Sequence, residues 1–194
     1  MTFDQIKSVL SAKTVGIAGC GGLGSNCAVA LARVGIGKLV MVDFDRVRES
    51  NLNRQYFFLD QIGEKKVTAL KENIHRIDPT VFLEAIDMKL TPETIPAVFA
   101  SCHAVVEAFD QADQKQMLIE TMLRYFPQKP LVVGLGMAGW GGNDKIHYRR
   151  SDHLYICGDE VSETSTQSPP LAPRVGMVAN MQANVVLEIL LGGK

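Results

Sequence analysis

Apolar residues occur along this chain in short, nearly continuous runs that alternate with longer segments of helical spacing. Short apolar runs bounded by glycine or polar residues are typical of strands that are buried on both faces, as in a parallel sheet. The longer segments place apolar residues three or four positions apart, which is typical of helices that cover such a sheet. The pattern predicts strands over 14–19, 38–43, 81–86, 104–108, 131–135 and 146–150, and helices over 25–34, 65–77, 111–126 and 173–191.

Turn and cap residues refine this assignment. Thr91 followed by Pro92 predicts an N-cap and a proline at the first helical position. The glycine-rich turn over 139–144 predicts that the strand at 146–150 runs antiparallel to the strand before it. Alternating strands and helices indicate an α/β, Rossmann-like fold: a mainly parallel sheet, helices on both faces and an antiparallel extension near the C-terminus. We expect a single domain over 1–194.

Composition narrows the class of protein. The chain has 194 residues, of which 46% are hydrophobic and 21% charged, and its formal net charge is −1. These values exclude general disorder and give no basis for bulk electrostatic binding of nucleic acid or an anionic membrane. No apolar run approaches the roughly 20 residues that cross a bilayer, and the N-terminus lacks a signal-peptide pattern, so we expect a cytoplasmic protein. The four cysteines form no CxxC pair, so no zinc site is expected.

A glycine motif follows the first predicted strand. Gly19, Gly21 and Gly24 fit G-x-G-x-x-G between a strand and a helix, and Gly22 adds a fourth glycine. Such a turn lets backbone N–H groups approach a phosphate at a helix N-terminus. Asp43 ends the next predicted strand, where a carboxylate can accept ribose hydroxyls. Alone, the pattern fits a nicotinamide dinucleotide, and the alternative is a turn that only permits close helix packing.

The residues after Asp43 favour a triphosphate. Arg54 offers a planar set of donors, Asn51 offers a neutral amide, and Lys66 begins a predicted helix whose N-terminus also attracts an anion. Each residue alone could be an ordinary surface residue. Their combination within one segment indicates phosphate binding.

At these residues the sequence resembles the ThiF/MoeB/HesA family, the bacterial relatives of the ubiquitin-activating enzymes. The resemblance covers nearly the whole chain and is most specific where the glycine motif is combined with SNLNRQ. The matching segments are GCGGLGSN (19–26), DFDRVRESNLNRQ (43–55), IGEKK (62–66), EAFDQ (107–111), GLGMAG (134–139) and parts of 172–183.

The resemblance implies an activity. Members adenylate the C-terminal glycine of a small β-grasp carrier protein that ends in Gly-Gly, using ATP and Mg²⁺. The absence of zinc pairs and the short length resemble a compact ThiF subgroup associated with thiamine biosynthesis, which implies a ThiS-like sulfur carrier and a homodimer. By the same resemblance Asp43 binds ribose, and the glycine motif and Asp45 also belong to the nucleotide-binding residues. Asn51, Arg54 and Lys66 hold phosphates, and Asp110 holds Mg²⁺. Arg54, Lys66 and Asp110 carry the chemistry.

Two departures from the family leave alternatives open. Residues 1–13 contain no arginine, whereas larger members begin with an arginine-bearing helix that reaches the partner subunit. Cys157 precedes the loop in which some members carry a sulfur-transfer cysteine, and a buried structural cysteine is the favoured interpretation. A nicotinamide-dependent oxidoreductase and a nucleotide-binding relative without catalysis are the competing functions.

Overall fold

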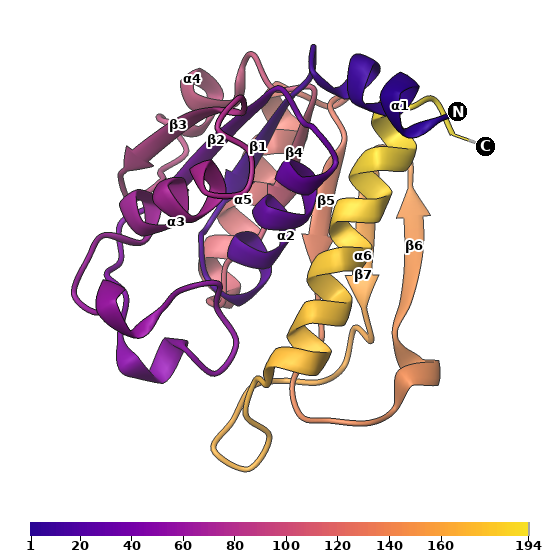
Figure 1. Ribbon diagram of the computed structural model, residues 1–194. Coiled ribbons are helices and arrows are strands. Elements are labelled where there is room, and N and C mark those ends of the chain that lie inside the picture. Colours follow the sequence, from indigo (N-terminus) through magenta and orange to yellow (C-terminus); the bar gives the residue numbers. More distant parts are fainter. Residues whose placement is uncertain (194) are drawn as a thin grey trace.

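One sheet organises the molecule (Figure 1). The computed structural model describes residues 1–193, and its seven strands lie in the order β3-β2-β1-β4-β5-β7-β6. All neighbouring strands are parallel except β6 and β7, which are antiparallel. The strands are β1 Thr14–Ala18, β2 Lys38–Asp43, β3 Phe82–Asp87, β4 Ala104–Glu107, β5 Leu131–Gly134, β6 His147–Ser151 and β7 Leu154–Gly158. The helices are α1 Phe3–Leu10, α2 Gly22–Arg33, α3 Lys66–His75, α4 Ile95–Phe99, α5 Ala112–Tyr125 and α6 Ala172–Leu190, with 3-10 turns at Glu49–Asn51, Leu59–Gln61 and Asn143–Lys145.

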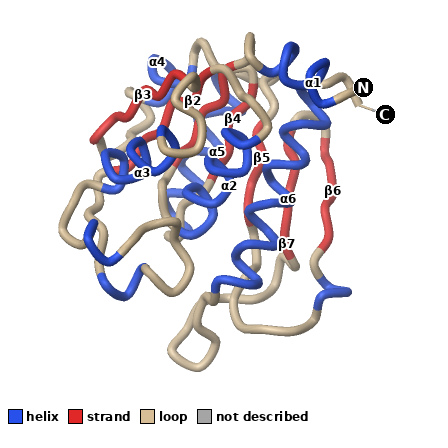
Figure 2. The backbone as a smooth tube through the Cα atoms, viewed as in Figure 1, coloured by secondary structure: helices blue, strands red, loops and turns tan. Residues whose placement is uncertain are grey.

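Helices cover both faces of the sheet, as the sequence predicts. Figures 1 and 2 show α2, α3 and α6 in front of the strands and α5 behind them. Side chains alternate between two hydrophobic clusters, because successive strand residues face opposite sides. On β1, Ile17 packs in the cluster under α2, α3 and α6, while Ala18 packs with α4 and α5.

The sheet has a switch point beside β1. From β1 the chain adds β2 and then β3 on one side, and later adds β4 and β5 on the other. The turns after β1 and β4 therefore lead to helices on opposite faces of the sheet, and the crevice of an open α/β sheet is expected between them, outside the carboxyl ends of these strands. In open α/β sheets this is the place where ligands bind.

Three elements differ from the sequence prediction. The antiparallel strand at 146–150 is β6, but it pairs with β7 rather than with β5, and the pattern did not predict β7. All five residues of β6 are exposed, so it lacks the burial pattern that identifies a strand's partners. The helix expected from Thr91 begins at Ile95, because residues 92–94 form a turn and Thr94 is the N-cap.

The third difference is α1, which the hydrophobic pattern did not predict. A capping box begins it: Gln5 N–H donates to Thr2 Oγ1 and Thr2 N–H donates to Gln5 Oε1. Only Leu10 of this helix is buried. Local capping rather than core packing therefore defines α1, and a search for apolar periodicity misses such an element.

The first prediction concerns Gly24. A Cβ atom there would lie 1.8 Å from the carbonyl oxygen of Gly19, so Gly24→Ala must displace the backbone of the glycine turn. We expect it to lower the free energy of unfolding by about 3 kcal/mol, the upper range for overpacking. Gly176→Ala is the matched control, since a Cβ there meets nothing within 4 Å inside α6. Gly176→Ala should raise the free energy of unfolding by up to about 1 kcal/mol. Urea denaturation of both variants measures the difference, and equal stabilities would contradict it.

Candidate nucleotide-binding site

The turn between β1 and α2 presents free backbone donors. Gly19 has a φ of 93°, in the region that favours glycine, and Gly21 is the N-cap of α2 without a side-chain capping bond. A Cβ on Gly19 would lie 2.9 Å from the carbonyl oxygen of Ala108, so the turns after β1 and β4 are in close contact. The first N–H groups of α2 therefore remain available to an anion in the crevice.

Asp43 braces this turn from the end of β2. Its Oδ2 accepts the Cys20 N–H at 2.7 Å, and its Oδ1 accepts the Asp45 N–H at 2.8 Å. The side chain is buried, and a carboxylate oxygen can accept more than one hydrogen bond. Asp43 therefore holds the glycine turn in place and still has lone pairs for ribose hydroxyls.

Lys66 and Asp45 form an ion pair beside it. Lys66 is the first residue of α3, and its Nζ lies 2.8 Å from Asp45 Oδ2. The Lys66 side chain is only 8% exposed, whereas that of Asp45 is 43% exposed. A buried ammonium at a helix N-terminus adds to the positive end of the helix dipole, so this corner of the crevice is suited to an anion.

The loop over 50–56 is fastened to the first turn of α2. Asn26 Nδ2 donates to the carbonyl oxygens of Gly22, at 2.7 Å, and of Arg54, at 2.9 Å. Ser25 Oγ accepts the Tyr56 N–H at 3.0 Å and donates to the Gly21 carbonyl at 2.6 Å. These bonds place the loop directly against the glycine turn.

Arg54 consequently lies beside α2. Its Cγ and Cδ atoms are 3.6 and 3.7 Å from where a Gly22 Cβ would be, and its Nη1 donates to Ser50 O and Asn53 Oδ1. Asn51 Oδ1 accepts the Arg48 N–H, a bond that does not use the amide donors of Asn51. The structure therefore brings Arg54 to the glycine turn, as the sequence predicts, and holds Asn51 in the same loop.

Asp110 lies on the neighbouring turn. It follows β4 by three positions, and its side chain is exposed at the carboxyl edge of the sheet. Within residues 1–193, no group of three or more His, Cys, Asp or Glu side chains is placed to hold a metal ion. Asp110 would therefore need oxygen ligands from outside this chain to hold Mg²⁺, and substrate phosphates commonly supply such ligands.

A buried ion pair that the sequence analysis missed closes the loop between β7 and α6. Arg174, in the first turn of α6, pairs with Asp159 and donates to the Gly141 carbonyl, and both side chains are almost fully buried. Burial opposes ionisation of Asp159, but the N–H groups of Ser162 and Val161 and the Arg174 guanidinium outweigh it. They lower the pKa of Asp159 to about 2. The pair joins both ends of the loop to the turn after β5.

Cys157 lies in the core rather than at the crevice. It is on β7, fully buried in the cluster under α2 and α6, and burial raises its pKa to about 12. The thiolate is the nucleophilic form of cysteine, so this environment does not favour sulfur transfer. We propose a structural role for Cys157.

The residues that the sequence pattern did not identify are of two kinds. Some have partners that are distant in sequence, and others lie beside a motif that already has a different role. Ser25 and Asn26 directly follow the glycine motif, and polar side chains at this position can form hydrogen bonds to a later loop. Arg174 had a local signal, because a cation in the first turn of a helix opposes the helix dipole and suggests a buried acidic partner. Gln55 is buried near Gly21 with an unpartnered Oε1 in the same crevice.

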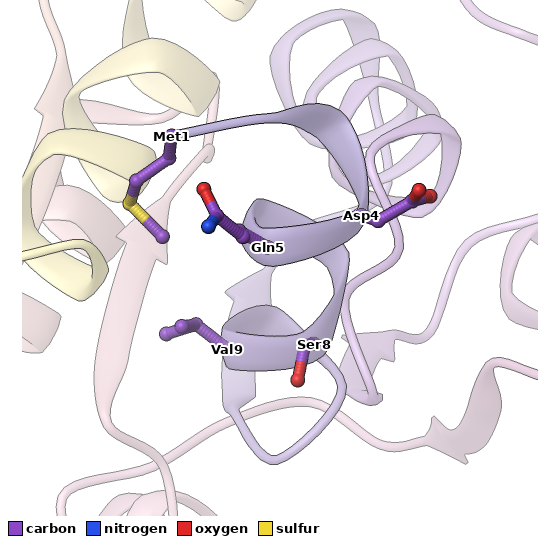
Figure 3. Close-up of a pocket in the computed structure, with 5 residues that line it drawn as sticks. All are labelled: Met1, Asp4, Gln5, Ser8 and Val9. Atoms are coloured by element: carbon purple, nitrogen blue, oxygen red, sulfur yellow. The ribbon is translucent and has the colours of Figure 1, made fainter.

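A second concave region lies far from this crevice. An open depression of about 610 Å³ lies on the outer face of α1, lined by Met1, Asp4, Gln5, Ser8 and Val9 (Figure 3). Figure 1 shows α1 beside the C-terminal end of α6, at the opposite end of the sheet from the glycine turn. This depression is therefore separate from the candidate site.

None of the helices within residues 1–193 has the length and apolar character that crossing a membrane requires.

Known proteins are similar to this chain along almost its whole length. A model of the ThiF family matches residues 3–194. The molybdopterin-synthase adenylyltransferase of Salmonella typhimurium is 27% identical over 179 residues, covering 90% of this chain and 71% of that protein. Its Escherichia coli counterpart is 27% identical over 195 residues, covering 98% and 77%. Protein HesA of Leptolyngbya boryana is 32% identical over 124 residues, covering 63% and 44%.

Solved structures show the same fold. Escherichia coli TcdA, a tRNA N6-threonylcarbamoyladenosine dehydratase solved with AMP and with ATP, has a TM-score of 0.87 at 20% identity, covering 97% of this chain and 90% of that chain. Escherichia coli MccB, solved with AMPCPP and MccA, has a TM-score of 0.74 at 20% identity, covering 96% and 58%.

A doubly wound sheet with a glycine turn at its switch point defines a Rossmann-like α/β protein. Within that class, this chain belongs to the ThiF family, as the sequence motifs indicated.

The second prediction concerns the buried ion pair. Asp159→Asn leaves the Arg174 guanidinium buried without a charge partner, so the free energy of unfolding should fall by about 3 kcal/mol or more at pH 7. Glu163→Gln, in the same loop but exposed, should change it by less than about 0.5 kcal/mol.

The pH dependence gives an independent check. The pKa of Asp159 in the folded protein is about 2, below the roughly 3.9 of an unfolded aspartate. The ionised side chain therefore contributes to the free energy of unfolding in full above about pH 4. This contribution to the free energy of unfolding is lost as the pH falls toward 2. The stability difference between wild type and Asp159→Asn should therefore narrow over that range, and a constant difference from pH 6 to pH 2 would contradict the assigned pKa.

Proposed function

We propose that this protein is an ATP-dependent adenylyltransferase that activates the C-terminal carboxylate of a small carrier protein. Two observations support it most strongly: Arg54 lies against the glycine turn, and the buried Lys66 pairs with Asp45, which Asp43 joins to the same turn. An oxidoreductase that binds a dinucleotide needs the turn and Asp43 but not Arg54 and Lys66. The relatives named adenylyltransferases, and the ATP complex of TcdA, are consistent with ATP as the substrate.

The reaction is a substitution at the α-phosphorus of ATP. A carrier carboxylate oxygen forms a bond to that phosphorus, the bond to the bridging oxygen breaks, and pyrophosphate leaves with the electron pair. The nucleophile is already ionised, so the protein does not need to remove a proton from it. Its task is to hold the reactants and to offset the negative charge that grows on the leaving pyrophosphate.

Residues from several elements around the crevice would bind different parts of the nucleotide. The α2 N–H groups and Arg54 would bind phosphate oxygens, Lys66 would exchange its Asp45 contact for the same anion, and Asp43 would accept ribose hydroxyls. Asp110 would hold Mg²⁺ together with phosphate oxygens, and the metal would supply charge neutralisation at the phosphates. Retention of Arg54, Lys66 and Asp110 speaks against an inactive relative.

The partners follow from the resemblance of the motifs. We propose a ThiS-like β-grasp sulfur carrier ending in Gly-Gly, with a place in thiamine biosynthesis, and a homodimer with two separate ATP sites. The position of α1 bears on the dimer. α1 contains no arginine, and it lies at the opposite end of the sheet from the nucleotide site of its own chain. It therefore cannot supply a cation to that site.

The third prediction tests the choice of nucleotide. ATP with Mg²⁺ should raise the melting temperature, because a ligand that binds only the folded state stabilises it by mass action. At a hundred times the dissociation constant the gain is about 2.7 kcal/mol. NAD at the same concentration should give a small shift or none. A larger shift with NAD than with saturating ATP, measured by scanning calorimetry, would favour the oxidoreductase.

The fourth prediction tests the chemistry. Arg54→Ala and Asp110→Ala should each lower carrier-dependent exchange of pyrophosphate into ATP by about 10²–10³, the usual cost of one preorganised charged contact to a transition state. Their melting temperatures should stay near wild type, because Arg54 lies on a loop and Asp110 is exposed on a turn. Arg124→Ala, exposed near the end of α5, is the matched control and should keep full exchange. If Arg54→Ala retained more than half of wild-type exchange, the proposed mechanism would be wrong.

A further inference from the structure

A second buried ion pair lies under the turn that carries Asp110. Glu107, the last residue of β4, is fully buried, and Lys115 reaches it from the second turn of α5 with only 14% of its side chain exposed. Lys115 Nζ donates to Glu107 Oε2 and also, at 2.8 Å, to the carbonyl oxygen of Gly134 at the end of β5. The sequence analysis assigned no role to either residue.

The pair closes the base of the turn over 108–111. Glu107 Oε1 accepts the Phe109 N–H at 2.8 Å, so one carboxylate holds both the start of the turn and, through Lys115, the helix that follows it. The Ala108 N–H donates to the Ala18 carbonyl at 2.9 Å, and the Lys115 N–H donates to the Gln111 carbonyl at 3.0 Å. The backbone on both sides of Asp110 is therefore fixed to β1, β4 and β5.

A fourth element adds to this network. Gln182, fully buried on α6, donates from Nε2 to the Glu107 carbonyl at 2.9 Å and to the Val132 carbonyl at 3.3 Å. It joins β4 to β5 directly below the carboxyl edge of the sheet. The helix that carries the buried Arg174 in its first turn is thus connected to the same end of β4 that supports the Asp110 turn.

Stability alone does not account for the pair. Burial raises the pKa of Glu107, and the Lys115 charge opposes that rise. Removing two charges from water costs about as much as their attraction returns, so an apolar pair of similar volume is often equally stable. A charged pair also fixes the orientation of its side chains, because the Lys115 ammonium must contact the Glu107 carboxylate and the Gly134 carbonyl at once.

We propose that Glu107 and Lys115 are positioning residues that hold Asp110 at the sheet edge, beside the glycine turn, in the conformation that binds the metal–nucleotide complex. The inference rests on the proposed function, which gives Asp110 its ligand. The contact between the turns supports it, since the Ala108 carbonyl lies 2.9 Å from where a Gly19 Cβ would be. A shift of the Asp110 turn would therefore disturb the phosphate-binding turn as well.

The test replaces the pair by apolar residues and measures metal binding directly. We expect Glu107→Leu/Lys115→Met to melt within about 5 °C of wild type, since such replacements are often neutral. Its complex with ATP should bind Mn²⁺ at least about tenfold more weakly, which corresponds to about 1.4 kcal/mol. Electron paramagnetic resonance of free Mn²⁺ gives this affinity without any turnover, and the Mg²⁺ concentration for half-maximal pyrophosphate exchange should rise by the same factor.

Three further variants make the outcome decisive. Lys115→Arg keeps a cation with several N–H donors for the Glu107 carboxylate and the Gly134 carbonyl, so it should keep Mn²⁺ affinity within about threefold of wild type. Lys129→Met removes a lysine that donates to the Phe99 and Ala100 carbonyls at the other end of β5, so it should leave Mn²⁺ affinity unchanged. If the double variant does not fold, Glu107→Gln/Lys115→Met serves, because the amide that replaces the carboxylate can still accept the Phe109 N–H while the ion pair and the link to Gly134 are lost.

The two possible failures are distinguishable. If Asp110→Ala binds Mn²⁺ in the ATP complex as tightly as wild type, the metal role in the proposed function is wrong. If Asp110→Ala weakens binding but the folded double variant does not, the positioning role is wrong and Asp110 keeps its role. When Asp110→Ala is combined with the double variant, the loss should be no greater than for Asp110→Ala alone, and additive losses would also overturn the inference.

Discussion

The contact between Gly24 and the carbonyl oxygen of Gly19 is the constraint on which the site depends. It brings the first turn of α2 so close to the end of β1 that no side chain fits between them. That approach leaves the N-terminal N–H groups of α2 facing the crevice and places Ser25 and Asn26 where they can fasten the loop that carries Arg54. Asp43 then holds the turn from the β2 side. The α2 N–H groups, Arg54 and Asp43, to which we assign phosphate and ribose binding, are therefore arranged around this backbone contact.

Most of the parallel part of the fold could be predicted from the sequence, because its strands are buried on both faces and read as unbroken apolar runs. β2 has the predicted bounds, and β1, β4 and β5 differ only at their last residue. The prediction missed β7, although Leu154–Gly158 is a short buried run of the same kind, and it also failed where the signal is absent. β6 is exposed along its whole length, so its sequence does not indicate that its partner is the later β7 rather than β5. α1 is defined by its cap and buries a single residue.

The same distinction applies to the site. The glycine turn, Asp43, Arg54 and Lys66 belong to short motifs, and the structure brings them together around one crevice. The partners in the Arg174–Asp159 and Glu107–Lys115 pairs could not be identified from the sequence, even though Arg174 carries a local signal, because their proximity depends on how β4, β5, β7 and the helices pack. Charged residues near the end of an apolar strand read as solvated until the fold shows that they are buried. The supporting layer of the site is for this reason visible only in three dimensions.

The buried Arg174–Asp159 pair has a consequence for how this chain can diversify. It fixes both ends of the segment between β7 and α6, and Pro170 adds bridges to Ala138 and Gly139. The tip of the segment, 163–167, is exposed, and a short turn between Ser165 and Ser168 is its own structure. Lengthening a loop whose ends are already closed costs little, about 0.6 kcal/mol for each doubling. Insertions can therefore accumulate at this tip and change which surfaces it meets while the glycine turn keeps its shape.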